Sequence, residues 1–254
     1  MPAASLAGRA VLVTGGSSGI GRAIALAAAG AGADVAITYR ANAEGAEAVQ
    51  RGISALGRRT SAIRLDLAST ASIADLGGAA RRALGRVDVW INNAGADILT
   101  GADASLSRVE KLDRLIAVDL RGTMLASWQA AEMLGAQTDG GVIINMSWDH
   151  VLTGMAGENP ELYAAVKGGI LAFSKSLARS VAPRVRVNVI APGFIETSFG
   201  ENADAAWRRT VVESTPLKRW GTPDDVAGAA VFLASPAAAF LTGQTILVGG
   251  GAVM

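Results

Sequence analysis

The sequence predicts one α/β domain with a parallel β-sheet and helices on both faces. Short β-rich runs alternate with longer alanine-rich segments about seven times along the 254 residues, and this alternation is typical of βαβ units. Several runs are apolar through their length, as in strands of a sheet that is covered on both sides. No linker, low-complexity segment or repeat interrupts the chain, so we expect a single domain over residues 1–254.

The expected strands are runs of strand-forming residues such as AVLVT and DVAITY. They cover residues 10–14, 34–39, 60–65, 87–92, 141–146, 184–190 and 245–248. The expected helices cover residues 19–30, 44–56, 70–84, 106–134, 160–181 and 224–233. Gly57 and Gly85 end the second and third helices, and Pro160 and Pro223 suit helix starts. Residues 194–220 break the alternation. A long insertion in a compact domain is often a lid or binding loop, and its position after a strand end favours that role here, although a surface excursion would also fit.

The composition argues against several classes of function. A formal net charge of +1 and scattered basic residues predict neither a nucleic-acid partner nor an anionic membrane surface. The absence of cysteine excludes disulfides and thiol nucleophiles, and a single histidine, His150, excludes a multi-histidine metal centre. No apolar run reaches the ~18–20 residues of a membrane span, and the first residues lack a signal-peptide pattern. We therefore expect a cytoplasmic protein without a metal.

A glycine-rich segment, TGGSSGIG at residues 14–21, follows the first strand and opens the first helix. Glycines allow a tight turn and let backbone N–H groups approach a pyrophosphate, while the helix N-terminus offers partial positive charge. Glycines also make ordinary turns, but the strand–loop–helix context favours a phosphate loop. The segment therefore predicts a dinucleotide site.

The spacing TGxxxGxG resembles that of the short-chain dehydrogenase/reductase family, and the likeness to 3-oxoacyl-carrier-protein reductases extends over essentially the whole chain. It is carried by NNAG at residues 92–95, Tyr163-x-x-x-Lys167, Pro192-Gly193, RWGTPDDVA at residues 219–227 and LTGQ at residues 241–244. The resemblance implies a Rossmann-type doubly wound domain with a seven-stranded sheet. It also implies an NAD(P)-dependent oxidoreductase that forms a homo-oligomer, usually a tetramer.

The resemblance implies cofactor roles for the matching positions. Those around the pyrophosphate would be Gly15, Ser17, Ser18, Gly19, Ile20 and Gly21. Those around the adenine and its ribose would be Asp66, Leu67, Asn92, Ala94 and Gly95. Those on the nicotinamide side would be Pro192, Gly193, Ile195 and Thr197, together with Tyr163 and Lys167.

The end of the second strand favours NADP over NAD. NAD sites place an acid there for the ribose 2′-OH, whereas NADP sites place an arginine nearby for the 2′-phosphate. Here the strand ends in Tyr39-Arg40, and Asp34 lies at its start, too early for that role. Arg40 is suited to a bidentate contact with phosphate, although it would also be ordinary as a solvated loop residue. We expect NADP and leave NAD possible.

Tyr163 and Lys167 are the expected acid–base pair. Their spacing places both side chains on one helix face. A phenol with an ordinary pKa near ~10 is a poor proton donor and acceptor at neutral pH, and a nearby ammonium lowers that pKa. The pair alone would be an incidental helical contact, but its place in the family pattern favours catalysis.

Two positions depart from the family pattern. Asp119 stands where an asparagine is usual, and it is expected to order a proton-relay water. Trp148 stands where the substrate-orienting serine is usual. Three replacements are open: Ser147 shifts into the site, His150 or its neighbour Asp149 supplies a donor, or the Trp148 indole N–H does so. Trp148, His150 and Phe194 are expected to line the substrate pocket, although His150 would also suit a surface loop.

The leading hypothesis is an NAD(P)H-dependent oxidoreductase acting on a small carbonyl compound or secondary alcohol, with Tyr163 as general acid/base. An alternative is an impaired dinucleotide-binding protein that acts as a sensor or partner. Retention of the fold for oligomerisation alone is a third possibility, against which the intact glycine loop argues.

Overall fold

The computed structural model describes residues 5–197, 200 and 203–254. Its centre is a seven-stranded sheet in the order β3-β2-β1-β4-β5-β6-β7, in which all neighbours are parallel. The strands are β1 (Ala10–Val13), β2 (Asp34–Tyr39), β3 (Thr60–Arg64), β4 (Val89–Asn92), β5 (Gly141–Met146), β6 (Val185–Pro192) and β7 (Thr245–Val248). The predicted α/β class and seven-stranded parallel sheet are confirmed.

The sheet has its topological switch point between β1 and β4. From β1 the chain builds outward through β2 to β3, and it then returns to add β4 on the other side. Crossovers on the two sides leave a crevice beyond the carboxyl ends of these strands, which is where open α/β sheets bind their ligands. The glycine-rich loop and the NNAG segment both leave the sheet at this crevice.

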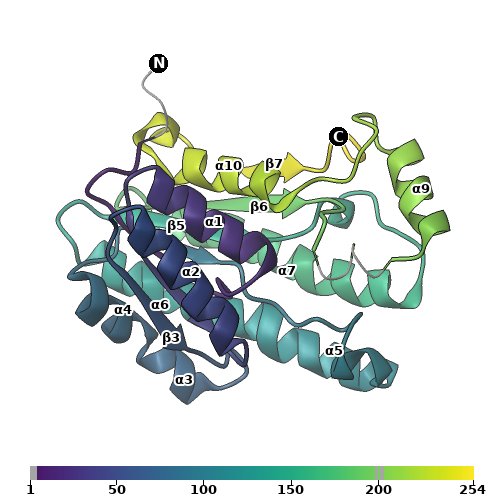
Figure 1. Ribbon diagram of the computed structural model, residues 1–254, viewed down its shortest axis with the longest axis horizontal. Coiled ribbons are helices and arrows are strands. Elements are labelled where there is room, and N and C mark those ends of the chain that lie inside the picture. Colours follow the sequence, from purple (N-terminus) through teal and green to yellow (C-terminus); the bar gives the residue numbers. More distant parts are fainter. Residues whose placement is uncertain (1–4, 198–199, 201–202) are drawn as a thin grey trace.

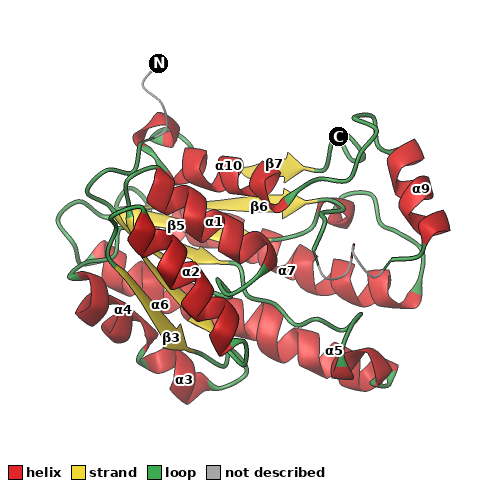
Figure 2. Ribbon diagram, in the orientation of Figure 1, coloured by secondary structure: helices red, strands yellow, loops and turns green. Residues whose placement is uncertain are grey.

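Helices cover both faces of the sheet (Figures 1 and 2). One layer contains α1 (Gly19–Gly30), α2 (Ala43–Ala55) and α10 (Pro223–Ala234), and the other contains α4 (Leu76–Leu84), α6 (Thr123–Gly135) and α7 (Glu158–Val181). Side chains alternate between the two cores along β1, with Val11 and Val13 in one and Ala10 and Leu12 in the other. The apolar strands therefore serve both layers.

Two of the expected helices are divided. The third is broken at Asp75 into α3 (Thr70–Ala74) and α4. The long fourth helix contains α5 (Arg108–Leu115), a π-helical segment η2 (Ile116–Gly122) and α6. Short 3-10 turns η1 (Ala102–Ser105), η3 (Asp149–Val151) and η4 (Pro236–Ala238) complete the connections.

The expected lid region contains a helix that was not predicted, α9 (Ala205–Ser214). The Asp204 carboxylate caps it by accepting the backbone N–H groups of Ala206 and Trp207. Residues 198, 199, 201 and 202 of the expected lid lie outside the described residues. In Figure 1, α9 stands at the edge of the molecule toward which the carboxyl ends of the strands point.

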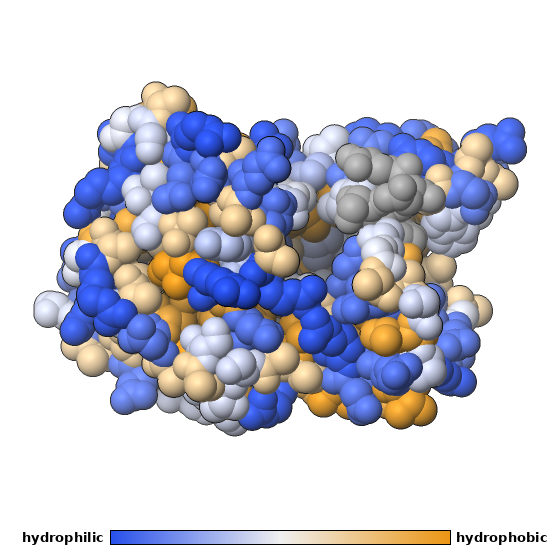
Figure 3. Space-filling model, turned by 60° about the horizontal axis from the view of Figure 1, so that its bottom comes forward, coloured by the Kyte–Doolittle hydropathy of each residue, from blue (hydrophilic) through white to orange (hydrophobic). Residues whose placement is uncertain are grey.

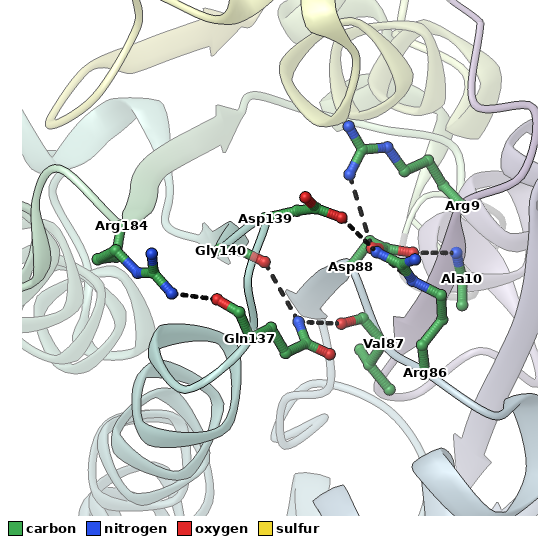
Figure 4. Close-up of polar contacts among 9 residues, drawn as sticks. All are labelled: Arg9, Ala10, Arg86, Val87, Asp88, Gln137, Asp139, Gly140 and Arg184. Atoms are coloured by element: carbon green, nitrogen blue, oxygen red, sulfur yellow. Dashed lines mark hydrogen bonds and ion pairs between the residues drawn. The ribbon is translucent and has the colours of Figure 1, made fainter.

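A polar network links the strands at their amino ends, opposite the crevice (Figure 4). The fully buried Asp88 carboxylate accepts the backbone N–H of Ala10 at 2.8 Å and pairs with the guanidinium groups of Arg86 and Arg9. The Asp88 carboxylate raises the pKa of Arg86 above its ordinary value. Because the network ties the starts of β1 and β4, it stabilises the strands from whose far ends the crevice opens.

The face in Figure 3 carries mostly hydrophilic side chains with small hydrophobic patches, and its outline is notched between two sides of the molecule. Large exposed hydrophobic side chains include Trp128, Leu217 and Phe240. Within the described part of the chain, no helix combines the length and apolar character needed to cross a membrane.

Candidate active site

The glycine-rich loop presents an open helix N-terminus to the crevice. Ser18 precedes α1 in an extended conformation, its side chain makes no capping hydrogen bond, and the first turn of α1 has no acidic residue. The backbone N–H groups at this helix start therefore stay free for an anion, and the helix dipole favours negative charge there. Thr38 anchors the loop, because its hydroxyl accepts the N–H of Gly15 at 3.1 Å.

Two glycines in this loop are required by its geometry. Gly15 has a φ of 66°, which a side chain would strain. A Cβ on Gly21 would lie 2.2 Å from the carbonyl oxygen of Gly15 and 2.5 Å from Nδ2 of Asn93. The helix thus starts in direct contact with the loop, and only glycine fits at this position.

The cleft beside this loop has a volume of about 1010 Å³. The positions predicted to bind the cofactor that line it are Gly15, Ser17, Ser18, Gly19, Ile20, Gly21, Arg40, Asp66, Leu67, Ala94, Gly95 and Thr197. Pro192, Gly193 and Ile195 line the adjoining pocket, which has a volume of about 510 Å³. The structure thus brings together nearly all of the predicted positions along one continuous groove.

Asn92 is an exception, because its side chain is buried rather than facing the cleft. Its amide donates to Ser127 Oγ at 3.0 Å and to Asn145 Oδ1 at 2.8 Å, inside the core. The cleft is lined instead by Asn93, whose amide donates to the carbonyl of Thr14. The sequence could not separate the two neighbours, since strand alternation decides which one faces inward.

Arginines lie at the adenosine end of the cleft. Arg40 is exposed on its rim, and Arg22 in the first turns of α1 lines the same cleft, although the sequence analysis did not single it out. Asp34 is engaged at the other end of β2, where it pairs with Arg59 at 2.7 Å. Among the described residues, no acid occupies the end of β2.

Tyr163, Lys167 and Asp119 meet where the groove passes from the cleft into the smaller pocket. Lys167 Nζ lies 2.8 Å from Asp119 Oδ2 and 5.7 Å from the centre of the Tyr163 ring. Asp119 Oδ1 accepts the backbone N–H of Ala96 at 2.7 Å, so the carboxylate joins the segment after β4 to α7. Among the described residues, no partner engages the Tyr163 hydroxyl, which belongs to a pocket-lining residue.

The π-helical segment positions Asp119. Residues 116–122 carry an extra residue per turn in an otherwise α-helical stretch, and such bulges are frequent at functional sites. The bulge directs the Asp119 side chain toward Lys167 and the Ala96 N–H, where it is completely buried. Helical periodicity in the sequence does not reveal this local change of pitch.

The electrostatics differ from the expectation that Lys167 lowers the pKa of Tyr163. Burial raises the pKa of Tyr163 above its ordinary value, and the negative charges of Asp119 and Asp97 raise it further. The ammonium of Lys167 is paired with Asp119, so Tyr163 faces an ion pair instead of a lone cation. The phenol is therefore held in its protonated, donating form.

Ser147 does not present a free hydroxyl proton to the pocket. Its hydroxyl donates to the backbone carbonyl of Lys167 at 2.8 Å, and the residue is buried. The shift of Ser147 into the role of substrate-orienting donor is thus not what the structure shows. The hydroxyl instead ties the loop after β5 to α7, the helix that carries Tyr163 and Lys167.

Aromatic side chains gather at the outer end of the site. Trp148 stacks on His150 with ring centres 5.0 Å apart and meets Tyr163 edge-to-face at 6.1 Å. Phe194 contacts His150 at 5.3 Å and Trp207 of α9 at 5.6 Å. Trp148 and Phe194 line the pocket as predicted, whereas His150 lies behind them.

Two polar residues that line this pocket, Asp97 and Asn159, were not predicted from the sequence. Asp97 caps its own loop by accepting the N–H groups of Leu99 and Thr100. Asn159 accepts from the buried ammonium of Lys111 at 3.4 Å. Within the described residues, no group of histidine, aspartate and glutamate side chains is arranged to hold a metal.

Comparison with known proteins agrees with this geometry. A family model described as Enoyl-(Acyl carrier protein) reductase matches residues 15–253. A solved structure of a short-chain dehydrogenase from Burkholderia cenocepacia, in complex with NADP, superposes with a TM-score of 0.87 at 36% identity, over 97% of this chain and 98% of that one. This chain belongs to the short-chain dehydrogenase/reductase family.

Relatives with named activities support the same conclusion. The 3-oxoacyl-[acyl-carrier-protein] reductase FabG of Chlamydia pneumoniae is 38% identical over 97% of this chain and 98% of its own length. The L-rhamnose 1-dehydrogenase (NAD(P)(+)) of a Sphingomonas species is 38% identical over 97% of this chain and 96% of its own. This short-chain dehydrogenase/reductase is thus an oxidoreductase of a family that binds NAD(P).

Proposed function

We propose that the protein is an NADP(H)-dependent oxidoreductase that interconverts a small carbonyl compound and its secondary alcohol, with Tyr163 as the general acid/base. The observation that carries the proposal is the placement of the Tyr163 hydroxyl. It is unpaired among the described residues and lies where the cofactor-sized cleft joins an apolar pocket of about 510 Å³. A carbonyl oxygen in that pocket would meet a proton donor at the boundary with the cleft.

NADPH would supply the hydride, held by the glycine loop, the start of α1 and the arginines of the rim. Tyr163 would donate its proton to the oxygen as negative charge develops there. The raised pKa keeps the Tyr163 phenol protonated but also makes it a weaker acid, so proton donation would depend on Lys167 stabilising the phenolate that forms. In the reverse direction the same group would have to lose its proton first, so alcohol oxidation is expected to require higher pH.

Solvent would return the proton to Tyr163 through a water ordered by Asp119, and Lys167 would stabilise the phenolate until then. The Lys167 ammonium lies near the Tyr163 ring and bonds Asp119, which is itself fixed by the Ala96 N–H. An ion pair at this position stabilises a transient phenolate through its cationic end while its anionic end limits the effect. Asp119 is therefore a positioning residue that sets both the place and the electrostatic strength of Lys167.

NADP is the proposed cofactor, with NAD as a weaker alternative. Two arginines of the described chain, Arg22 and Arg40, line the adenosine end of the cleft. The NADP complex of the Burkholderia relative is consistent with this choice. The substrate would be a mostly apolar molecule with a carbonyl group, because aromatic and aliphatic side chains dominate the pocket lining. We further propose that the protein is cytoplasmic and forms a homotetramer. Light scattering of the purified protein tests the tetrameric state.

The test is NADPH oxidation with a panel of ketones and β-keto esters, for the wild type and for Tyr163→Phe. We expect turnover with at least one ketone and a loss of about 10²–10⁴-fold in kcat for the variant, the usual contribution of a general acid. NADPH affinity of the variant should stay unchanged. Tight NADPH binding without turnover on the whole panel would instead support the alternative, an impaired member that binds the dinucleotide as a sensor.

A further inference from the structure

The loop after β5 carries a linked set of side chains that the reaction described above does not use. Asp149 is completely buried, His150 is mostly buried, and Trp148 forms part of the pocket wall beside Tyr163. A buried carboxylate and the chain's single histidine in this position call for a function. We propose that the Trp148 indole N–H is the hydrogen-bond donor to the substrate carbonyl oxygen, and that Asp149 and His150 are positioning residues that hold the indole. The inference rests on the proposed carbonyl chemistry of Tyr163.

The indole N–H of Trp148 has no acceptor among the described residues. Trp148 is half-buried and lines the pocket. Indole N–H groups in partly buried tryptophans usually have a partner. The neighbouring Ser147 hydroxyl is already bonded to the Lys167 carbonyl, so it leaves this wall of the pocket without a free hydroxyl donor. The indole N–H and the Tyr163 hydroxyl are then free donors on adjoining rings.

Contacts between aromatic rings hold the Trp148 indole in place. One ring face of Trp148 stacks on His150 with a 21° angle between the planes, and the indole meets Tyr163 at 82°. Phe194 also contacts His150, with an angle of 62° between the ring planes. Stacked and edge-to-face contacts of this kind contribute about 0.5–1.5 kcal/mol each and restrict ring rotation. The indole is therefore fixed relative to the phenol that donates the proton.

Asp149 holds the His150 ring in place. Asp149 Oδ1 accepts the His150 backbone N–H at 2.7 Å and lies 2.6 Å from His150 Nδ1, so the Asp149 carboxyl group and the imidazole share a hydrogen bond. The ring cannot turn without breaking that bond.

The Asp149 carboxyl group occupies a space beside two glycines, Gly193 and Gly249. Its Oδ2 has no hydrogen-bond partner among the described residues and lies against the backbone of both glycines. A Cβ on Gly193 would come within 2.6 Å of Oδ2, and a Cβ on Gly249 within 2.2 Å. The carboxylate thus fits only because both positions lack a side chain. Five positions on three segments then form one unit with Trp148 at its tip.

The direct test removes only the N–H. Trp148→Phe keeps an aromatic ring for His150, and we expect kcat to fall about 10²–10³-fold, as for loss of one oxyanion-type donor. NADPH affinity should not change. Trp148→Ser and Trp148→Ala form a matched pair that differs in a hydroxyl group, and the serine variant should turn over at least about tenfold faster. Wild-type kcat in Trp148→Phe would overturn the proposal.

The positioning role has its own comparison. Asp149→Asn keeps hydrogen-bonding atoms for the His150 backbone N–H and ring, whereas Asp149→Ala does not. We expect near-normal kcat in the first and a clear loss in the second, with KM for NADPH unchanged in both. Equal kcat in the two variants would contradict the role of Asp149. Circular dichroism checks that each variant is folded.

A spectroscopic readout separates this inference from the proposed function. In a ¹⁵N-tryptophan-labelled sample the five indole N–H resonances are observed, and Trp148→Phe assigns one of them. Addition of the ketone in the presence of NADP⁺, which permits no turnover, should shift the Trp148 resonance. Turnover that depends on Tyr163 without such a shift would overturn the donor role while leaving the proposed function intact. Absence of turnover altogether would sink both.

Discussion

The carboxylate of Asp119 lies 2.8 Å from the ammonium of Lys167, and the two side chains are 0% and 9% exposed. An asparagine at position 119 would leave the ammonium without a charged partner there. The aspartate gives Tyr163 a neutralised neighbour, and its negative charge raises the pKa of the phenol. This ion pair connects the π-helical segment to α7, the helix that carries Tyr163 and Lys167. A change at Asp119 would therefore alter both the packing and the charge beside Tyr163.

Asp119→Asn should therefore lower the pKa of Tyr163. Alcohol oxidation needs the phenolate, so the rising limb of kcat/KM for oxidation should move to lower pH in this variant. The measurement is a pH profile of alcohol oxidation by NADP⁺. Asp97→Asn is the matched control: Asp97 also raises the pKa of Tyr163, but it is exposed, and solvent screening should make its shift smaller. A midpoint that stays in place in Asp119→Asn would contradict the electrostatic account.

Arg40→Ala should weaken NADPH binding selectively. Loss of a charge-assisted contact to a phosphate costs about 1.5–3 kcal/mol, which corresponds to roughly a 10–100-fold increase in Kd. NADH lacks the 2′-phosphate, so its Kd should be almost unchanged. Arg51→Ala on α2 is the control, because its exposed side chain does not line the cleft and pairs with Glu47. Equal losses for NADPH and NADH would show that Arg40 does not read the 2′-phosphate.

Gly21→Ala should damage the phosphate loop. The new Cβ would approach the Gly15 carbonyl to 2.2 Å, so the loop and the helix start must separate. We expect a lower melting temperature and weaker NADPH binding. Gly30→Ala at the far end of the same helix meets nothing within 4 Å and should be neutral or slightly stabilising. Calorimetry and NADPH titration of both variants decide the matter, and unchanged binding in Gly21→Ala would count against this role of the loop.

The acid side of the stability profile should depend on Asp225. Its carboxylate pairs with Arg219 and accepts the Thr222 N–H at the start of α10, and the Arg219 guanidinium holds its pKa below the ordinary value. A depressed folded-state pKa adds stability that is present above the unfolded value near ~4 and is lost as pH falls below it. The melting temperature of Asp225→Asn should lie below the wild type at about pH 7, and the gap should narrow toward about pH 3. A gap that widens on acidification would reverse the sign.

Most of the architecture followed from local pattern. Strands such as β1 and β4 are apolar and buried on both sides, and all seven strands could be found from β-forming residues and from the glycines and prolines between them. Elements with weaker periodicity were not found. Helix α9 lies in a polar segment, and the break at Asp75 follows from a turn that the periodic pattern masks. The π-helical segment differs from an α-helix in its i→i+5 hydrogen bonds, and the helical spacing of apolar residues did not reveal it.

At the site, the sequence indicated which segments meet but not which atoms are free. Ser147 and Trp148 are neighbours, and only the structure shows that the hydroxyl is bonded to Lys167 while the indole faces the pocket. Asn92 and Asn93 present the same problem at the end of β4. The slot for Asp149 depends on Gly193 and Gly249, which lie on different strand ends and approach one another only in the fold.

The central claim is that Tyr163 protonates a carbonyl oxygen as hydride arrives from NADPH. The most direct measurement uses NADPH deuterated at the transferring position, with mass spectrometry of the alcohol formed from a reactive ketone. We predict deuterium on the carbinol carbon with the wild type, and about 10²–10⁴-fold slower labelling with Tyr163→Phe at unchanged NADPH affinity. NADPH that binds tightly but transfers no label, or a Tyr163→Phe variant that labels the alcohol at the wild-type rate, would contradict the claim.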